Sequence, residues 1–162
     1  SVKEIYGLMD AIFGENLGYS PVPFGLFERE IVQPFSVRHC PRTSLMTRAP
    51  DGTLAAVFLN FPDYGPISRN GYDGRVDLGT IQFDTHFEEL PAKTLLMKTV
   101  GVAPKFRRLG LHNLMLLQML EYSKDLYTKA VGALIRDGNP SSRFFSELSY
   151  ELRRYALFAK SL

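Results

Sequence analysis

The sequence lacks the features of an extracellular, membrane-spanning or metal-binding protein. Its 162 residues include no tryptophan and one cysteine, Cys40. One cysteine excludes an internal disulfide and a zinc site built from cysteines, and it fits a reducing compartment, so we expect a cytoplasmic protein. The longest apolar run, Leu114–Leu120, is interrupted by Gln118, whereas a spanning helix needs about 20 apolar residues. We therefore expect no membrane span, and nothing in the sequence suggests a metal.

The charge of the chain is nearly balanced but unevenly distributed. There are 19 basic and 17 acidic side chains, and 45% of the residues are hydrophobic, which is the composition of a single globular domain. Residues 1–97 hold 8 basic and 12 acidic side chains, whereas residues 98–162 hold 11 and 5. This asymmetry indicates either an anionic ligand near the last third or ordinary unevenness of surface charge. With a net charge of only +2 and no recognised module, we expect no nucleic-acid partner.

The first 61 residues predict two helices and a hairpin. Apolar residues at helical spacing predict a helix over Val2–Phe13, and a second, short helix is expected between Pro23 and Pro34. Two β-rich runs, Ser44–Arg48 and Thr53–Phe61, surround a Pro-Asp-Gly turn and predict an antiparallel hairpin.

The rest of the chain predicts a long connection followed by alternating strands and helices. Residues 62–93 have the composition of a loop with one strand near Val76–Phe83, and a connection of this length is usually functional or mobile. The apolar faces of Leu111–Thr128 predict a well-buried helix. The other expected elements are strands over Thr94–Val102, Ala130–Ile135 and Glu151–Lys160 and a helix over Pro140–Leu148. Strand, helix and strand in succession predict a parallel pair, and hence an α/β (α+β) fold with a sheet of mixed direction.

The segment from Val102 to His112 carries the clearest functional signal. A strand ends, a glycine-containing turn follows, and a long helix begins, which leaves backbone N–H groups free to bind an anion such as a pyrophosphate. Gly110 has no Cβ to block an oxygen. The basic side chains of Lys105, Arg107 and Arg108 would lie near the phosphates. The alternative interpretation is a solvated basic turn.

Two blocks of this sequence resemble the GNAT superfamily of acyl-CoA-dependent N-acyltransferases. The family pattern Val-x-Pro-x-x-[Arg/Gln]-x-x-Gly-x-[Gly/Ala] is matched from Val102 to Gly110, and His112 stands where a small residue is usual. Asn139-Pro-Ser-Ser-Arg-Phe-Phe resembles the asparagine-bearing helix of the family. The resemblance is strong over residues 94–160 and only architectural over residues 1–61. The family opens with a strand before its first helix, whereas this chain starts within the helix, so we expect a piece of a longer protein.

The resemblance implies a fold and a cofactor. The fold would be a GNAT-like mixed, mostly antiparallel sheet with a splayed parallel pair, flanking helices and no first strand. Residues 1–162 would form one domain, with helices and hairpin in 1–61, an acceptor-side connection in 62–93 and an acyl-CoA-binding core in 94–160. The cofactor would be acetyl-CoA or another acyl-CoA. The residues implied to hold it are Val100, Gly101, Val102, Lys105, Arg107, Arg108, Leu109, Gly110, Leu111, His112, Asn139 and Ser142.

The resemblance also implies a reaction, direct attack of an amine on the thioester. The acceptor would be a small-molecule or peptide amine, and helix 111–128 leaves room for a homodimer contact. Many members protonate the leaving thiolate with a tyrosine, but the matching position here is Phe145 or Ser146. The candidate catalytic residues are Ser146, Tyr150, His86 and Glu88, and water can also remove the proton. The alternative hypothesis is a non-catalytic acyl-CoA sensor or accessory domain of a larger protein.

Overall fold

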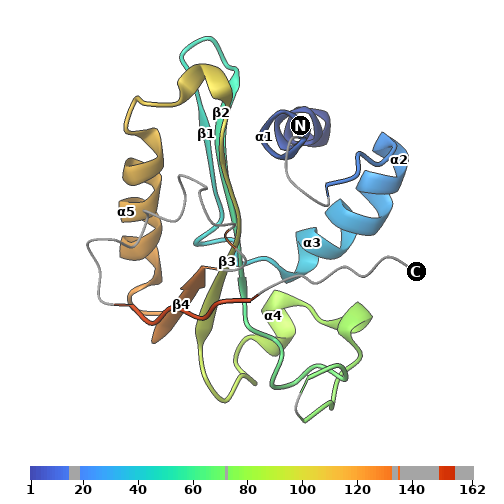
Figure 1. Cartoon of the computed structure of the whole chain (residues 1–162). Helices are drawn as coiled ribbons and strands as arrows, with labels where there is room; N and C mark the ends of the chain where they lie inside the picture. Colours follow the sequence, from blue (N-terminus) through green and yellow to red (C-terminus); the bar gives the residue numbers. More distant parts are fainter. Residues whose placement is uncertain (15–18, 72, 133–134, 136–149, 156–162) are drawn as a thin grey trace.

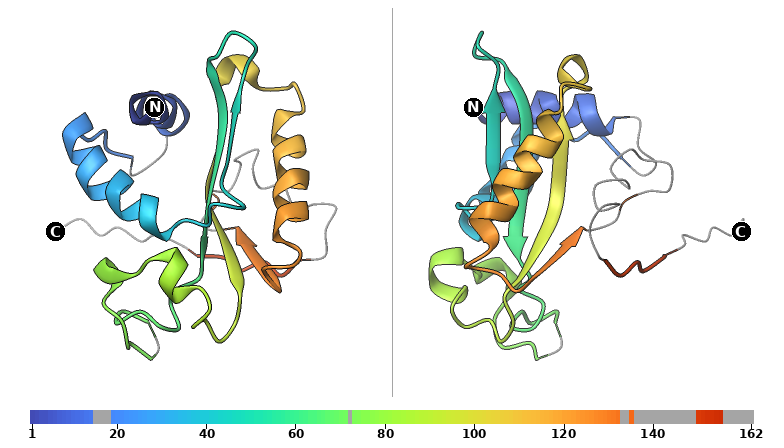
Figure 2. Two further views of the ribbon diagram at one scale, coloured as in Figure 1. Left: turned by 180° about the vertical axis from the view of Figure 1, so that it is seen from behind. Right: turned by 90° about the vertical axis from the view of Figure 1, so that its left-hand side faces the viewer.

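The computed structural model describes residues 1–14, 19–71, 73–132, 135 and 150–155. Its strands, β1 (Leu45–Arg48), β2 (Leu54–Pro62), β3 (Thr94–Val102) and β4 (Lys129–Gly132), form one sheet in that order. One face of this sheet is covered by α5 (Leu111–Ser123), and the other by α1 (Val2–Phe13) and the helical segment from α2 (Phe24–Phe27) to α3 (Gln33–Arg38) (Figures 1 and 2). The fold is therefore three-layered, with the sheet between two sets of helices.

The helix predicted over Val2–Phe13 is confirmed as α1. Ser1 caps it, because its hydroxyl accepts from the backbone N–H of Glu4 while the Glu4 side chain contacts the Ser1 backbone. The buried side chain of Leu8 packs with Leu54 and Val57 of β2. The central strand is thus buried on both faces, which explains its nearly continuous apolar sequence.

The second helix is longer than predicted, because it does not stop at Pro34. It runs from Phe24 to Arg38 through a π turn at Glu28–Val32. In this turn the N–H of Gln33 donates to the carbonyl of Glu28, five residues back. An uninterrupted α-helix would press the proline ring against the carbonyl four residues earlier, and the wider π turn provides the room.

The predicted hairpin is confirmed. β1 pairs antiparallel with β2, and β2 continues one residue beyond the predicted end, to Pro62. In the turn, Gly52 has a φ of 82°, and the Asp51 carboxylate accepts from the N–H of Thr53 at 2.9 Å. Such a left-handed turn residue explains the Asp-Gly sequence.

The strand predicted near Val76–Phe83 is wrong. This stretch holds a 3₁₀ turn over Leu78–Thr80 and the start of α4 (Phe83–His86), and its one β-like contact is an isolated bridge between Ser68 and Val76. Asp77 caps the 3₁₀ turn by accepting from the N–H of Gly79, which favours a turn over an extended strand. The connection is nevertheless well packed, since it contributes several residues to the core: Tyr64, Ile67, Ile81, Phe87 and Leu90.

The strand Thr94–Val102 is confirmed as β3 and pairs antiparallel with β2. The next helix begins at Leu111 as predicted but ends at Ser123, five residues before the predicted end. A reversal follows, in which the N–H of Thr128 donates to the carbonyl of Lys93 at 2.9 Å and starts β4. This pairing to the neighbouring strand ends the helix earlier than its apolar composition suggests.

The expectation that this helix is well buried holds for one face only. Met115, Leu116 and Met119 are buried against the sheet. Leu114 and Leu117 are 63% and 66% exposed, so the outer face of α5 is apolar and open to solvent.

The parallel pair is confirmed for β3 and β4, whose register runs from Thr94↔Lys129 to Met97↔Gly132. The predicted final strand Glu151–Lys160 is wrong for residues 151–155, which pair with no strand and are exposed. Residues 156–160 of this predicted strand lie outside the described residues. So do residues 133–134 of the predicted strand Ala130–Ile135 and all of the predicted helix Pro140–Leu148. No helix in the described part is long and apolar enough to cross a membrane, and Cys40 is fully buried in the core.

Candidate functional site

The candidate site lies where β3 ends and α5 begins. The N–H of Ala103 donates to the carbonyl of Ala55 at 2.8 Å, which fixes the end of β3 against β2. A single 3₁₀ turn, Pro104–Phe106, leads into Arg107–Gly110. Two residues there have left-handed backbones, Arg108 with φ 67° and Gly110 with φ 71°. Such a conformation costs a non-glycine residue about 1–2 kcal/mol, so the backbone of Arg108 is held in it by its surroundings.

The loop presents a series of backbone donors without backbone acceptors. Within the described residues, no backbone carbonyl accepts from the N–H groups of Arg108, Leu109 and Gly110. The next N–H groups, from Leu111 onward, lie in the first turn of α5, where a helix supplies no acceptor. The helix dipole adds partial positive charge at the same place. This loop can therefore bind an anion through its main chain.

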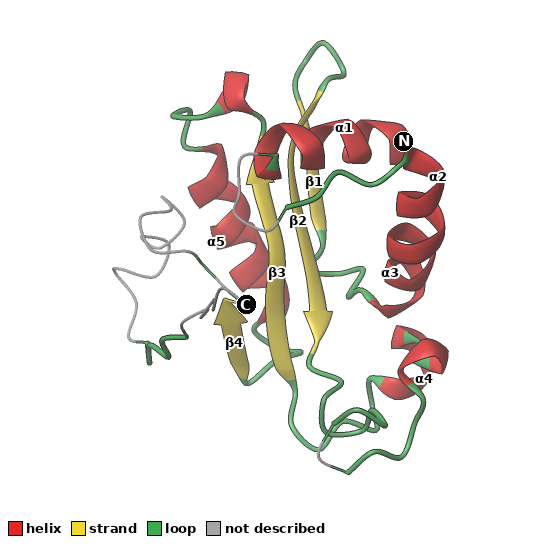
Figure 3. Cartoon of the chain, turned by 45° about the vertical axis from the view of Figure 1, so that its right-hand side comes forward, coloured by secondary structure: helices red, strands yellow, loops and turns green. Residues whose placement is uncertain are grey.

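Two glycines at the site serve different purposes. A Cβ built on Gly110 would meet no atom within 4 Å, so its positive φ and not crowding explains the glycine. A Cβ on Gly101 would lie 2.3 Å from Cδ1 of Ile12. Figure 3 shows α1 crossing the sheet over this end of β3. Gly101, which the resemblance assigns to the cofactor, thus also lets α1 approach the sheet.

The basic side chains of the loop have partners within the chain. Nζ of Lys105 lies 4.0 Å from a carboxylate oxygen of Asp51 and 4.7 Å from the centre of the Phe106 ring. Nε of Arg107 donates to the Val102 carbonyl at 3.4 Å. The pKa of Asp51 is lowered, mainly by hydrogen bonds from Thr53, with a smaller effect of Lys105. The hairpin tip and the loop therefore lie together, and Lys105 and Arg107 remain exposed.

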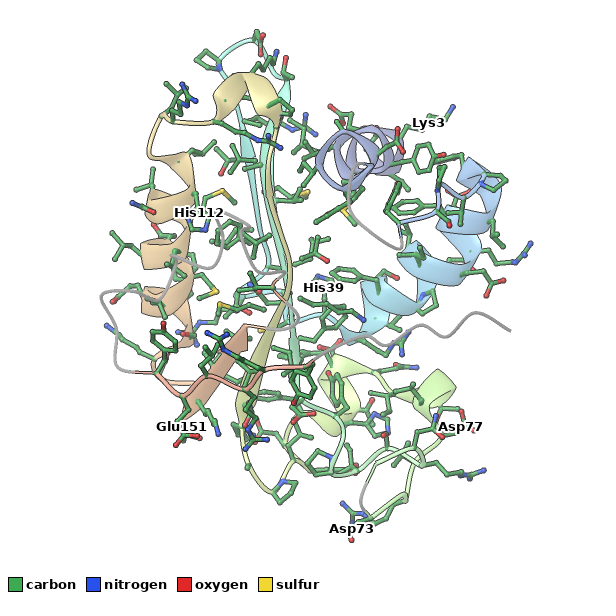
Figure 4. The ribbon with its side chains drawn as sticks, in the orientation of Figure 1. Lys3, His39, Asp73, Asp77, His112 and Glu151 are labelled. Atoms are coloured by element: carbon green, nitrogen blue, oxygen red, sulfur yellow. The ribbon has the colours of Figure 1, made fainter. Side chains whose placement is uncertain are left out.

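His112 points toward the sheet. Its ring lies 5.4 Å from the ring of Phe58 on β2, and Figure 4 labels it beside α5. Burial lowers the pKa of His112, although a hydrogen bond with Asn113 opposes this effect. Burial therefore favours the neutral imidazole, and its contact with Phe58 gives it a packing role.

The side chains of Val100 and Val102 pack against the core under α5. Because the N–H of Ala103 donates to β2 and backbone groups alternate along a strand, those of Val100 and Val102 face the β4 side. The described parallel ladder runs to Met97↔Gly132, five residues before Val102, and residues 133–134 lie outside the described part of the chain. Of the other residues assigned to the cofactor, Leu111 is half-buried and Leu109 is 72% exposed. Asn139 and Ser142 lie outside the described residues.

The candidate catalytic residues are not brought together by any described contact. Nδ1 of His86 contacts the backbone of Gln82 at 3.1–3.2 Å within α4. Glu88 forms an ion pair with Lys93 at 2.5 Å. Both lie on the connection that precedes β3, at the opposite end of that strand from the loop (Figure 1). Tyr150 is 54% exposed, outside any helix or strand, and Ser146 lies outside the described residues.

Sequence reasoning missed Lys98, which lies in a β-bulge of β3. The β2–β3 register shifts between Leu59↔Thr99 and Asn60↔Met97, so Lys98 is an extra residue in β3. A β-bulge of this kind leaves no local sequence signal. A lysine within an otherwise apolar strand was the one available hint. In the described part of the chain there is no cluster of three or more residues suited to a metal ion.

Comparisons with known proteins show the fold. No family model matches the chain, and no curated protein does. Among solved structures, aminoglycoside 6′-N-acetyltransferase AAC(6′)-IG from Acinetobacter haemolyticus is similar with a TM-score of 0.59 and 14% identity, over 100% of this chain and 93% of that one. The ribosomal-protein-alanine N-acetyltransferase from Brucella melitensis biovar Abortus 2308 has a TM-score of 0.59 and 10% identity, over 99% and 92%.

A third structure, aminoglycoside N-acetyltransferase AAC(6′)-Iy in complex with CoA, has a TM-score of 0.59 and 12% identity, over 99% of this chain and 88% of that one. The chain therefore has the fold of the GNAT acetyltransferases, as its two sequence blocks indicate.

Proposed function

We propose that this protein is an N-acetyltransferase that transfers an acetyl group from acetyl-CoA, or another acyl group from its CoA ester, to an amine. The observation that carries the proposal is the row of backbone N–H groups, without a described backbone acceptor, that starts at Arg108 and runs into the first turn of α5. These donors suit the pyrophosphate of CoA. The exposed guanidinium groups of Arg107 and Arg108 add positive charge beside it.

The pantetheine arm would lie along β3. Its amide groups can pair with the backbone of Val100 and Val102 as an added strand does, because these backbone groups face away from β2. This mode of binding needs no particular side chain on the strand. It would place the thioester beside β3, past the last described pair of the β3–β4 ladder.

The reaction would be a direct transfer. The amine nitrogen attacks the thioester carbonyl carbon, a C–N bond forms, and the C–S bond breaks with its electron pair on sulfur. The amine proton passes to water or to a side chain, for which His86, Glu88, Tyr150 and Ser146 remain the predicted candidates. The protein's main contribution is to align the two reactants. The acceptor would be a small-molecule or peptide amine bound on the side of α1, α2–α3 and residues 62–93.

A direct test has two stages. Isothermal titration with acetyl-CoA should show saturable binding, and mixing with a panel of polyamines, amino acids and peptides should release free CoA thiol. Absence of binding at high micromolar acetyl-CoA would contradict the proposal. Binding without turnover for any amine would favour the second candidate, an acyl-CoA sensor. That candidate draws on the engagement of His86 and Glu88 within their own segment.

A further inference from the structure

The bulge in β3 places one lysine directly after the last described pair of the parallel ladder. Met97 is paired on both sides, to Asn60 of β2 and to Gly132 of β4. The next residue, Lys98, has no partner in the β2 register, and the described β4 ladder has already ended. Thr99 then resumes pairing with Leu59 of β2. Lys98 is therefore the first residue beyond the described parallel ladder and the extra residue of the bulge.

The charge of Lys98 is not used by the described part of the fold. Its side chain is exposed, and no described carboxylate forms an ion pair with it, whereas Lys93, Lys105 and Lys124 each have one. Its neighbours show that the strand around it is fixed. Met97 is buried in the core, and Gly101 is pressed against Ile12 of α1. An ammonium group without a described ionic partner thus projects from a rigid strand.

The length of the cofactor arm brings its sulfur to the same place. From the phosphate oxygen to the sulfur, pantetheine has about twelve backbone bonds, which equals about four residues of extended chain, or about 13 Å along a strand. With the pyrophosphate at the loop that follows Val102, an arm running back along β3 ends about four residues earlier, beside Lys98.

We propose that the ammonium group of Lys98 contacts the thioester sulfur and stabilises the negative charge that develops on it during transfer. This inference rests on the proposed function and adds to it a residue that would stabilise the charge on the leaving sulfur. As the amine nitrogen bonds to the carbonyl carbon, the electron pair of the C–S bond moves to sulfur, and the lysine holds the resulting thiolate as an ion pair until water protonates it. The amine proton leaves separately to solvent. Positive charge placed at a developing anion stabilises the transition state more than the ground state.

The test compares three variants of the full chain, with an amine acceptor found in the thiol-release screen. Lys98→Met removes the charge and keeps the length of the side chain. Lys98→Arg keeps the charge. The matched control is Lys129→Met, because Lys129 is also exposed on a strand of the same parallel pair, at the opposite end of the ladder.

In Lys98→Met we expect kcat to fall on the order of 10²-fold, with KM for acetyl-CoA and its Kd from titration changed less than about twofold. Lys98→Arg should recover most of the rate, and Lys129→Met should match the wild type. A kcat in Lys98→Met within about threefold of the wild type would overturn the inference. So would a loss that appears in Kd for acetyl-CoA instead of kcat. If the wild type binds acetyl-CoA and releases no thiol with any amine, the proposed function fails before Lys98 is tested.

Discussion

The two ends of β3 differ in how their polar groups are used. At the amino end, polar side chains of residues 62–93 are paired within that segment. Asp63 and Asp77 accept from nearby backbone N–H groups, and Glu88 forms an ion pair with Lys93. At the carboxyl end, the loop leaves the N–H groups of Arg108, Leu109 and Gly110 without a described acceptor. These three residues are exposed, so either water or an anionic ligand can accept from their N–H groups. The described contacts thus pair polar groups of the amino end within the chain and leave backbone donors at the carboxyl end.

The largest effect is expected at Gly101. This residue lies on β3 just before the loop, and the close approach of α1 explains why it is a glycine. In Gly101→Val, the new side chain would collide with Ile12, because a Cβ on residue 101 would lie 2.3 Å from the Cδ1 atom of Ile12. We expect a loss of about 2–3 kcal/mol in the free energy of unfolding, measured by urea denaturation. Adding Ile12→Ala should recover part of this loss in a double-mutant cycle. Purely additive effects would show that the two residues are not in contact.

A substitution at Gly110 tests the binding loop without a steric clash, because a Cβ there would meet no atom within 4 Å. Gly110→Ala should cost about 1–2 kcal/mol of stability, since φ is 71°, and should weaken acetyl-CoA binding about tenfold or more by shifting the donors. Gly52→Ala is the matched control: its φ is 82° and its Cβ also meets open space, but it lies in the hairpin turn. Calorimetric titration of both should show reduced affinity for the first alone. Equal affinities would remove the loop from the binding site.

A substitution of His112 tests whether a residue at the carboxyl end of β3 makes the stability of the protein depend on pH. Burial holds the pKa of its ring below the ordinary value of about 6.5 in the folded state. The unfolded chain therefore takes up a proton first, and this residue makes stability decrease as the pH falls below about 6.5, until the lower folded pKa is passed. His112→Gln should flatten that part of the curve relative to the wild type. Denaturation midpoints measured between pH 4.5 and 8 supply the comparison.

The smallest effect is expected at the amino end. The His86 ring contacts the backbone of Gln82, and Glu88 is paired with Lys93. His86→Gln and Glu88→Gln should therefore keep kcat within about twofold of the wild type. A decrease of more than tenfold, together with loss of the acidic limb of the pH–rate profile, would instead identify one of them as the general base.

The sequence was informative where local pattern and packing agree. The strand Thr94–Val102 and the start of the following helix were predicted to the residue, because an apolar strand, a proline and a glycine mark them. Pro34 was misleading, since a π turn accommodates it. The end of α5 depends on the pairing of Thr128 with Lys93, a contact between distant residues that no local pattern encodes.

The site was predictable to a similar degree. The motif located the donors around Gly110, since their geometry follows from a strand, a turn and a helix in succession. The second purpose of Gly101 could not be predicted, because it depends on where α1 crosses the sheet. The bulge at Lys98 depends on the register between two strands that are far apart in sequence. Charged positions whose importance comes from register are therefore found only once the strands are placed.

The π turn at Glu28–Val32 has a consequence for how this helix tolerates changes in length. It accommodates one residue more than a regular helix of the same span, so the faces of the helix before and after it keep their orientations toward the sheet. Deleting one residue within the turn would keep both faces toward the sheet but would press the Pro34 ring against the carbonyl four residues earlier. Inserting one residue elsewhere in the helix would rotate everything beyond it by about 100°. The extra residue of the turn and Pro34 therefore depend on each other, and the helix could lose that residue only together with Pro34→Ala.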